Sequence, residues 1–244
     1  EKIQKTMNRS LEPVNFIIND QVLDANVDLE LITTRCANVI GEIKSGNRKY
    51  RDEYVVLGAH FDHVGEGGVG SGSRKPDLLQ VHPGADDNAS GTSGLLEIAQ
   101  KLAANKSRLK RSILLIGFDA EEKGLLGSKY FMSNPTVDPN NIITMINMDM
   151  IGRMKDSSAT VGGVGTSPLF EPLIDSLETD RSFNLSISSQ GFGPSDHASF
   201  YSENIPVLFF FSGIHDDYHT PDDTWKNINL QGTTDIVNLV YDVT

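Results

Sequence analysis

Short apolar runs alternate with polar and glycine-containing segments along most of the chain, and their lengths predict the secondary structure. Apolar runs with the length and composition of buried strands occur at residues 54–59, 111–118, 142–148 and 206–211. Apolar positions with helical spacing follow, at residues 93–104, 127–133, 169–177 and 234–241. This alternation predicts an α/β fold with a mostly parallel, mixed central sheet and helices on both of its faces.

Two segments depart from this alternation. Near the start, residues 1–11 predict a short helix that ends before Pro13. Polar turns join the strand-forming runs at 14–18 and 29–43, which predicts an antiparallel pair.

Residues 66–83 are rich in glycine, serine and charged residues, which predicts a long loop. Loops of that length in a compact domain usually either lack order or have a function.

Composition narrows the possible functions. The chain of 244 residues carries a formal net charge of −12, which argues against non-specific binding of nucleic acid because its phosphates would be repelled. The single cysteine, Cys36, excludes an intramolecular disulfide and a cysteine-rich metal site, so any metal has to be bound by histidine and carboxylate. No apolar run approaches the roughly 20 residues that cross a bilayer.

Acidic, histidine and asparagine residues gather directly after the predicted strands or in the loops, in clusters at residues 60–62, 85–88, 119–122, 147–149 and 218–224. In a mostly parallel sheet, ligands bind at the carboxyl ends of the strands. Carboxylates there are costly to desolvate unless they are paired or bind a metal, so several that converge indicate a cation. Imidazole beside carboxylate makes zinc the leading candidate.

Each cluster alone has a simpler explanation. A histidine close to an aspartate usually forms a hydrogen-bonded surface pair, a glutamate pair often begins a helix, and an aspartate after a strand is often a turn former or a helix cap. Only the clusters together, in this order and at this spacing, exceed what turns and caps explain.

The same clusters carry a resemblance to a known family. The matching segments are GAHFDHVG (58–65), HPGADDNASG (82–91), LLIGFDAEEKGLLGS (114–128), INMDMIG (146–152), SDHASF (195–200) and YHTPDDT (218–224). In this combination the chain, from about residue 38 to residue 228, resembles the M28 family of zinc aminopeptidases. The resemblance implies the phosphorylase/hydrolase-like fold of zinc peptidases, metallopeptidase activity and two Zn²⁺ ions.

The resemblance assigns five metal ligands: His60, Asp87, Glu122, Asp149 and His219. One zinc ion would be bound by His60, Asp87 and Asp149. The other would be bound by Asp87, Glu122 and His219, so that Asp87 bridges the two ions. A cis peptide bond is also expected after the bridging residue, between Asp87 and Asn88.

The same resemblance implies the catalytic roles. Two ions about 3.5–4 Å apart hold a water between them and lower its pKa from about 16 towards about 7. Glu121 would act as the general base on that water and then deliver the proton to the leaving amine. Tyr218 would donate a hydrogen bond to the oxyanion, and Asp62 would fix the orientation of the His60 ring.

The implied substrate is a peptide with a free N-terminus, whose first peptide bond is hydrolysed. The loops at 66–81, 191–194 and 213–217 would line its pocket. Phe192 and Ile214, in two of these loops, favour an apolar first residue of the substrate.

Other residues with chemical potential are expected to support the site. Ser195, Asp196 and His197 resemble a compressed catalytic triad, but adjacent residues cannot converge as a triad requires. Asp196 and His197 are therefore expected to support the pocket wall through hydrogen bonds. Three histidines outside the family's ligand positions are expected to be exposed or to lie behind the ligands: His63, His82 and His215.

Alternatives stay open. A carboxypeptidase or dipeptidase of the same dizinc type would use the same ligands, although no arginine pair suited to a C-terminal carboxylate is evident near the motifs. Glutaminyl cyclases resemble the fold but lose part of the ligand set, which this chain keeps. A metal-free binding homologue would have substituted ligands or a replaced Glu121, and neither is present.

The first residues resemble the connector that follows a protease-associated domain in many M28 relatives. We therefore expect residues 1–30 to be a connector that packs on the catalytic domain, and residues 31–244 to be that single globular domain. The same resemblance predicts a secreted or periplasmic protein. A glycan on the Asn88 sequon would cover Asp87, which favours a bacterial source. The oligomeric state is left open.

Overall fold

The structure, a computed structural model, describes residues 2–11, 13–14, 19, 22, 24–29, 33–178 and 181–244. The chain divides into two units, Glu1–Arg35 and Cys36–Thr244. The first contains α1 (Lys2–Ser10), which confirms the helix predicted at residues 1–11. The strand predicted at 14–18 lies outside the described residues except for Val14, which has no regular structure.

The packing of residues 1–30 on the catalytic domain stays a prediction.

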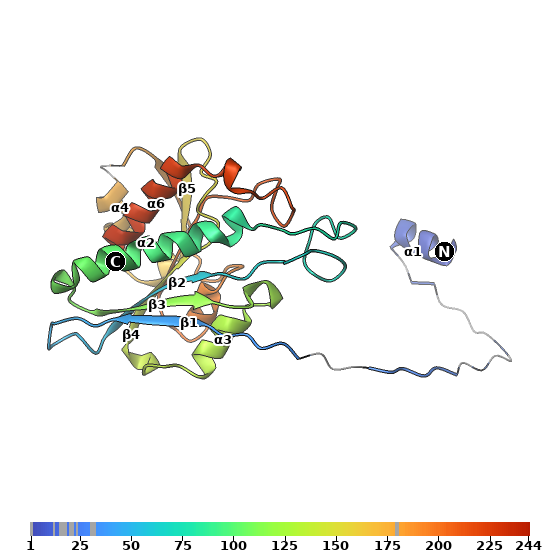
Figure 1. The fold of residues 1–244 in the computed structure, drawn as a ribbon, viewed down its shortest axis with the longest axis horizontal. Coiled ribbons are helices and arrows are strands. Elements are labelled where there is room, and N and C mark those ends of the chain that lie inside the picture. Colours follow the sequence, from blue (N-terminus) through green and yellow to red (C-terminus); the bar gives the residue numbers. More distant parts are fainter. Residues whose placement is uncertain are drawn as a thin grey trace. The chain divides into compact units, whose positions relative to one another are not determined.

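The second unit is built around one mixed sheet (Figure 1). Among the described residues it has seven strands in the spatial order β1-β3-β2-β4-β7-β5-β6. Their bounds are β1 (Val39–Ile43), β2 (Tyr54–His60), β3 (Ser112–Phe118), β4 (Ile142–Met148), β5 (Ser158–Gly162), β6 (Asn184–Ile187) and β7 (Val207–Phe211). The central strands β3, β2, β4 and β7 are parallel, while β1 is antiparallel to β3 and β5 is antiparallel to β7. The predicted mostly parallel, mixed sheet is confirmed.

The central strands are buried on both faces, which explains their continuous apolar runs. Every residue of β2 is buried. Its Gly58 lies between two large neighbours, because a Cβ there would come within 2.5 Å of the Phe118 ring and 2.7 Å of the Met145 side chain. A side chain at position 58 would force the Phe118 ring and the Met145 side chain to move.

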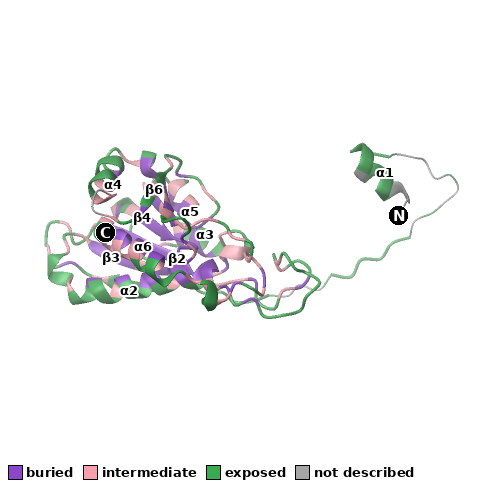
Figure 2. Cartoon of the chain, turned by 90° about the horizontal axis from the view of Figure 1, so that it is seen from above, coloured by how far each residue is buried: buried purple, intermediate pink, exposed green. Residues whose placement is uncertain are grey.

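Helices cover both faces of the sheet, as predicted. α2 (Gly91–Ala104), α4 (Phe170–Glu178) and α6 (Leu230–Val243) bury their apolar sides in one core cluster, and α3 (Leu126–Ser133) and α5 (His197–Tyr201) contribute to a second. In the second cluster, the Phe200 ring packs against Phe118 and Phe131, with centroids 6.0 and 5.7 Å apart. Buried strands lie between exposed helix faces in Figure 2.

Several predicted elements differ from the structure. The strand predicted at 29–43 is wrong over residues 33–38, which have no regular structure; only β1 forms. That run pairs with β3 only from Val39 onward, and pairing rather than composition decides its length. The short elements β5, β6 and α5 were not predicted, because segments of four or five residues carry too few periodic positions.

The topology places several chain segments at one edge of the sheet. Since β2, β3, β4 and β7 are parallel, their carboxyl ends meet there. β2 ends at His60, β3 is followed by residues 119–122, β4 is followed by Asp149, and β7 leads into residues 212–224. No helix among the described residues combines the length and the apolar character needed to cross a membrane.

Candidate metal centre and active site

A compact turn, η1 (Ala85–Ser90), fixes Asp87 at this edge. The backbone N–H groups of Asp86 and Asp87 donate to the Asp223 carboxylate over 3.0 and 3.1 Å. The peptide bond between Asp87 and Asn88 is cis, as the resemblance implied. The Asn88 side chain donates to the backbone oxygen of Met148 over 3.0 Å, which ties the turn to the end of β4.

The first group of possible ligands joins the ends of β2 and β4. His60 Nε2 lies 3.3 Å from Asp87 Oδ1 and 3.3 Å from Asp149 Oδ1. His60 Nδ1 lies 3.1 Å from the backbone oxygen of Asp62, an acceptor, which favours the tautomer with its proton on Nδ1. The lone pair of Nε2 then faces two carboxylates. These three donor atoms could bind one cation between them.

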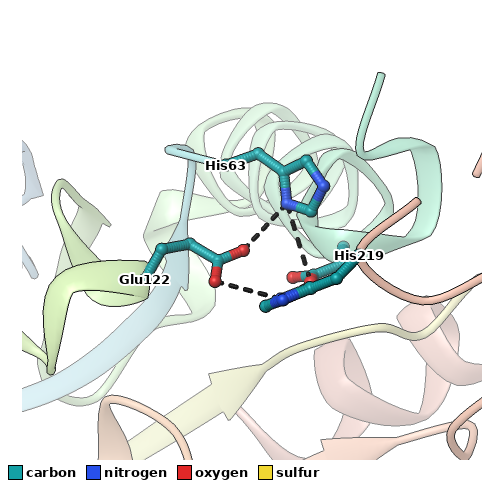
Figure 3. A group of neighbouring side chains, drawn as sticks. His63, Glu122 and His219 are labelled. Atoms are coloured by element: carbon teal, nitrogen blue, oxygen red, sulfur yellow. Dashed lines mark hydrogen bonds and ion pairs between the residues drawn. The ribbon is translucent and has the colours of Figure 1, made fainter. Parts of the chain in front are cut away.

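The second group joins the loop after β2, the turn after β3 and the loop after β7 (Figure 3). His219 Nε2 lies 3.0 Å from Asp87 Oδ2 and 3.0 Å from Glu122 Oε2. His63 Nδ1 lies 2.8 Å from Glu122 Oε1 and 3.6 Å from Asp87 Oδ2. Asp87 therefore belongs to both groups, one carboxylate oxygen in each.

The spacing of these atoms fits zinc. Ligand atoms about 2.0–2.1 Å from a tetrahedral zinc ion lie about 3.3–3.4 Å from one another. The nitrogen-to-oxygen distances of His60 and His219 to their carboxylates, 3.0 to 3.3 Å, are close to that separation. The donor set of imidazole and carboxylate, without sulfur, also suits zinc.

The electrostatics of the site favour positive charge. Burial on its own would lower the pKa of His219, but the Asp87 and Glu122 carboxylates outweigh burial and raise that pKa to about 10. Burial likewise works to lower the pKa of His60, and Asp149 raises it well above its ordinary value. Without a metal, these carboxylates stabilise the protonated imidazoles. A divalent cation bound among them would take the place of those protons.

Asp62 lies behind both groups. Its carboxylate is 3.6 Å from His60 Nδ1, and it accepts hydrogen bonds from the backbone N–H groups of Glu121 (2.9 Å) and Glu122 (3.2 Å). Asp62 therefore orients the His60 ring mainly through its backbone oxygen, while its carboxylate holds the turn η3 (Glu121–Lys123). This second contact was not predicted from the sequence.

Glu121 and Tyr218 flank the possible ligands without joining either group. Burial raises the pKa of the Glu121 carboxyl to about 8, and the nearby Asp149 charge adds to this effect. Burial and the Asp87 charge also raise the pKa of Tyr218, so its hydroxyl keeps its proton at neutral pH and can donate a hydrogen bond. The Tyr218 ring stacks on that of His219, with centroids 3.9 Å apart.

A cavity of about 370 Å³ opens beside these groups. Asp87, Glu121, Asp149 and Tyr218 form its polar end. Its largest apolar lining residues are Met150, Phe192, Phe209, Phe211 and Ile214. The structure thus puts Phe192 and Ile214, both singled out in the sequence, on the wall of one cavity with the possible ligands at its end.

Comparison with known proteins places the chain in a family. The model of the family described as Peptidase family M28 matches residues 38–244. The chain belongs to peptidase family M28. The M28 chain is 30% identical to aminopeptidase YwaD of Bacillus subtilis (strain 168), in a match that covers 89% of this chain and 47% of the relative. It is 27% identical to leucine aminopeptidase 2 of Trichophyton rubrum, over 79% of this chain and 41% of the relative.

Solved structures agree with this assignment. The structure of BSAP, a zinc aminopeptidase from Bacillus subtilis, superposes with a TM-score of 0.68 at 28% sequence identity, over 84% of the M28 chain and 48% of that protein. The M28 chain thus spans about half the length of the relatives it matches. Its fold is that of the zinc aminopeptidases, as the resemblance implied.

The remaining histidines of the M28 chain fall into two kinds. His82 is bonded within its own loop, 2.7 Å from the backbone oxygen of Gln80, and His215 lies behind the site, 3.3 Å from Asp86. His63 contacts a predicted ligand, with Nδ1 2.8 Å from Glu122 Oε1, and its Nδ1 also lies among the atoms of the second group that could hold a metal, so the expectation that it is exposed or lies behind the ligands stays a prediction. The available signal was its position, three residues after His60 in the loop that follows β2.

The Ser195, Asp196 and His197 run of the M28 chain forms no triad. Ser195 Oγ accepts a hydrogen bond from Asn147 over 2.8 Å. His197 lines the cavity, where its ring stacks on Phe209 with centroids 4.3 Å apart, and burial lowers its pKa to about 4. His197 therefore supports the pocket wall as a neutral, stacked ring, whereas hydrogen bonding had been expected.

Proposed function

We propose that the chain is the catalytic part of an aminopeptidase that binds two zinc ions and removes apolar residues from the N-terminus of peptides. One observation carries the proposal. Two groups of imidazole and carboxylate, which share Asp87, lie at the acidic end of an apolar cavity. That arrangement offers a place for a metal pair, for a charged amine and for a side chain in one continuous site.

When bound, the zinc ions would supply a water of lowered pKa and would polarise the scissile carbonyl. His60, Asp87 and Asp149 would hold one ion, and Asp87, Glu122 and His219 the other. Glu121 would accept the proton of the attacking water and pass it to the leaving amine. Its pKa of about 8 falls when cations occupy the neighbouring carboxylates, which makes it a better fit for a base at neutral pH.

The residues that line the cavity favour a substrate amine over a substrate carboxylate. Its polar end consists of acidic groups and Tyr218, and no arginine or lysine is among the described residues that line it. Arg153, which lies near the site, is already paired with Asp217. With zinc bound, the ions neutralise Asp87 and Asp149, so the preference rests on the missing cationic partner for a C-terminal carboxylate among the described lining residues. This favours the aminopeptidase over the carboxypeptidase alternative.

The wall of the cavity favours an apolar first residue. Phe192 and Ile214 keep 63% and 73% of their surface exposed, so the free protein offers an apolar face that a substrate side chain can cover. The rings of Phe209 and Phe211, which stack with centroids 5.7 Å apart, line the same cavity. We therefore expect aliphatic or aromatic residues to be preferred over charged ones at the first substrate position.

The test is hydrolysis of aminoacyl p-nitroanilides by the zinc-loaded chain, with zinc content measured in the same samples. We expect two zinc ions per chain, turnover of leucyl p-nitroanilide, much slower turnover of the lysyl and glutamyl compounds, and none of N-acetyl-leucyl p-nitroanilide. The N-acetyl compound differs from leucyl p-nitroanilide only in lacking a free amine, so it tests whether the enzyme requires that amine. Turnover of a peptide from its C-terminal end would overturn the proposal in favour of a carboxypeptidase.

Glu121→Gln tests the base. It should keep both zinc ions and lose about 10²–10⁴-fold in kcat, which is the usual contribution of a general base. Glu97→Gln, an exposed isosteric change on α2, is the matched control and should retain full activity. A near-normal rate for Glu121→Gln would mean that another group accepts the proton.

A further inference from the structure

His63 occupies a position in the second ligand group that the predicted ligand set does not use. Its Nδ1 faces two of the predicted ligands, 2.8 Å from Glu122 Oε1 and 3.6 Å from Asp87 Oδ2. His219 Nε2 approaches the same two carboxylates from another direction. Figure 3 shows His63, Glu122 and His219 converging on one small volume.

The His63 ring is held in this position by its surroundings. Only 10% of the side chain is exposed. The ring lies against Gly84, where an added Cβ would come within 2.7 Å of the ring atom Cγ. It meets the His219 ring edge-on, with centroids 5.5 Å apart. Glycine at position 84 thus leaves the space that the ring fills. A ring fixed in this way loses little conformational freedom on binding a metal.

We propose that His63 is a fourth protein ligand of the cation bound by Asp87, Glu122 and His219. The four donor atoms lie within 4.8 Å of one another, as atoms around a single ion must. Neutral imidazole is the commonest protein ligand of zinc, through either ring nitrogen. The inference rests on the proposed function, because it concerns one of the two ions proposed there.

The alternative role for His63 is donation of an Nδ1–H hydrogen bond to Glu122. In that case the N–H would point into the space between Glu122 and Asp87, which is where the cation would lie. Nδ1 also faces Asp87 Oδ2, the same oxygen that His219 Nε2 faces, so the positive end of an N–H dipole would lie close to the cation, which repels it. The lone pair of Nδ1 is therefore the form that a bound cation favours.

A fourth ligand makes the two proposed ions unequal. The ion at Asp87, Glu122, His219 and His63 would have four protein ligands, one more than the other ion. The ion at His60, Asp87 and Asp149 would have three and keep an open position, as catalytic zinc sites do. Substrate exchange would then take place mainly at the more buried ion.

A crystal structure of the zinc-loaded chain tests the proposal directly. We expect zinc about 2.0–2.1 Å from His63 Nδ1. Zinc in both groups with His63 Nδ1 more than about 3 Å from the metal, at hydrogen-bond distance from Glu122, would overturn this inference and leave the proposed function intact. Absence of zinc from both groups would overturn both.

Solution measurements give an independent check. X-ray absorption of the dizinc chain should count three imidazoles shared by the two ions, and two in His63→Ala. In competition with a chelator, His63→Ala should weaken one zinc ion at least about tenfold and leave the other unchanged; loss of a group behind a ligand has a similar effect, so the imidazole count is the measurement that decides. His82→Asn is the matched control, because that neighbouring ring, 6.5 Å from His63, belongs to neither ligand group. An imidazole count that is the same in wild type and His63→Ala would contradict the proposal.

Discussion

The two halves of the candidate metal centre are built differently. In one half, His60 is the last residue of β2 and Asp149 directly follows β4, so the sheet itself positions both side chains. In the other half, Glu122 is on the short turn η3 and His219 is in the long segment after β7. His60 is 1% exposed, whereas 12% of the His219 side chain is. Asp87 joins the halves.

The difference shows how a ligand in a loop, such as His219, can be fixed in position as well as His60, which is in a strand. His219 has a left-handed backbone (φ 55°), which is uncommon outside glycine. Its Nδ1 donates to the backbone oxygen of Gly72 over 3.0 Å, and its backbone oxygen accepts from Arg74 over 3.0 Å. Two contacts to a second loop thus replace the ladder of hydrogen bonds that holds His60.

The largest effect should come from the residue that both halves share. Asp87→Ala removes one oxygen from each ligand group and leaves the two remaining carboxylates, Glu122 and Asp149, without the residue that joins them. We expect both zinc ions to be lost and activity to fall at least about 10³-fold, because the metals supply most of the electrostatic stabilisation. Metal analysis and turnover of leucyl p-nitroanilide measure this.

Asp156→Asn is the control for Asp87→Ala, because Asp156 is exposed and outside both ligand groups. It should keep two zinc ions and normal turnover. If Asp87→Ala retained two tightly bound ions, the two halves would be independent sites and the comparison between them would no longer describe one centre.

Asp62→Ala should have the next largest effect, since Asp62 contacts a member of each half. It removes the acceptor of the Glu121 and Glu122 N–H groups and a carboxylate near His60. Loss of a group behind the metal ligands usually lowers metal affinity or activity about 10–100-fold. Asp62→Asn keeps one acceptor oxygen and should lose less. Equal losses in the two variants would show that its charge, and not its hydrogen bonds, is what matters.

The smallest effect should follow from a change that touches only the loop-borne half. Gly72 has φ of +98°, and its oxygen accepts from His219. Gly72→Ala strains that conformation by roughly 1–2 kcal/mol and loosens the loop. We expect weaker binding of one zinc ion, by up to about tenfold, and no change at the other. Gly70→Ala, with φ of +81° in the same loop but no neighbour within 4 Å, is the control. Weaker binding of both zinc ions would mean that a change in one half of the centre also affects the other half.

Much of the strand-borne half could be predicted from the sequence. The buried runs that end at His60 and precede Asp149 have strand length and composition, and parallel pairing brings their ends together. The contact of His63 with Glu122 could not be predicted, because the sequence shows only that His63 follows His60 by three residues. It depends on the path of the loop after β2 and on the space that Gly84 leaves, and neither has a periodic pattern. The predicted secreted or periplasmic location stays a prediction.

Local composition by itself determined which segments become buried strands and helices and which polar residues follow them, because burial of apolar runs and the chemistry of the polar clusters can be read along the chain. The tertiary structure alone decided which of those polar residues come into contact. Only the fold brings His63 next to Glu122, lets Asp62 hold η3, and places Gly72 where it positions His219. These contacts join residues distant in sequence, so they depend on loop paths that only the complete fold defines.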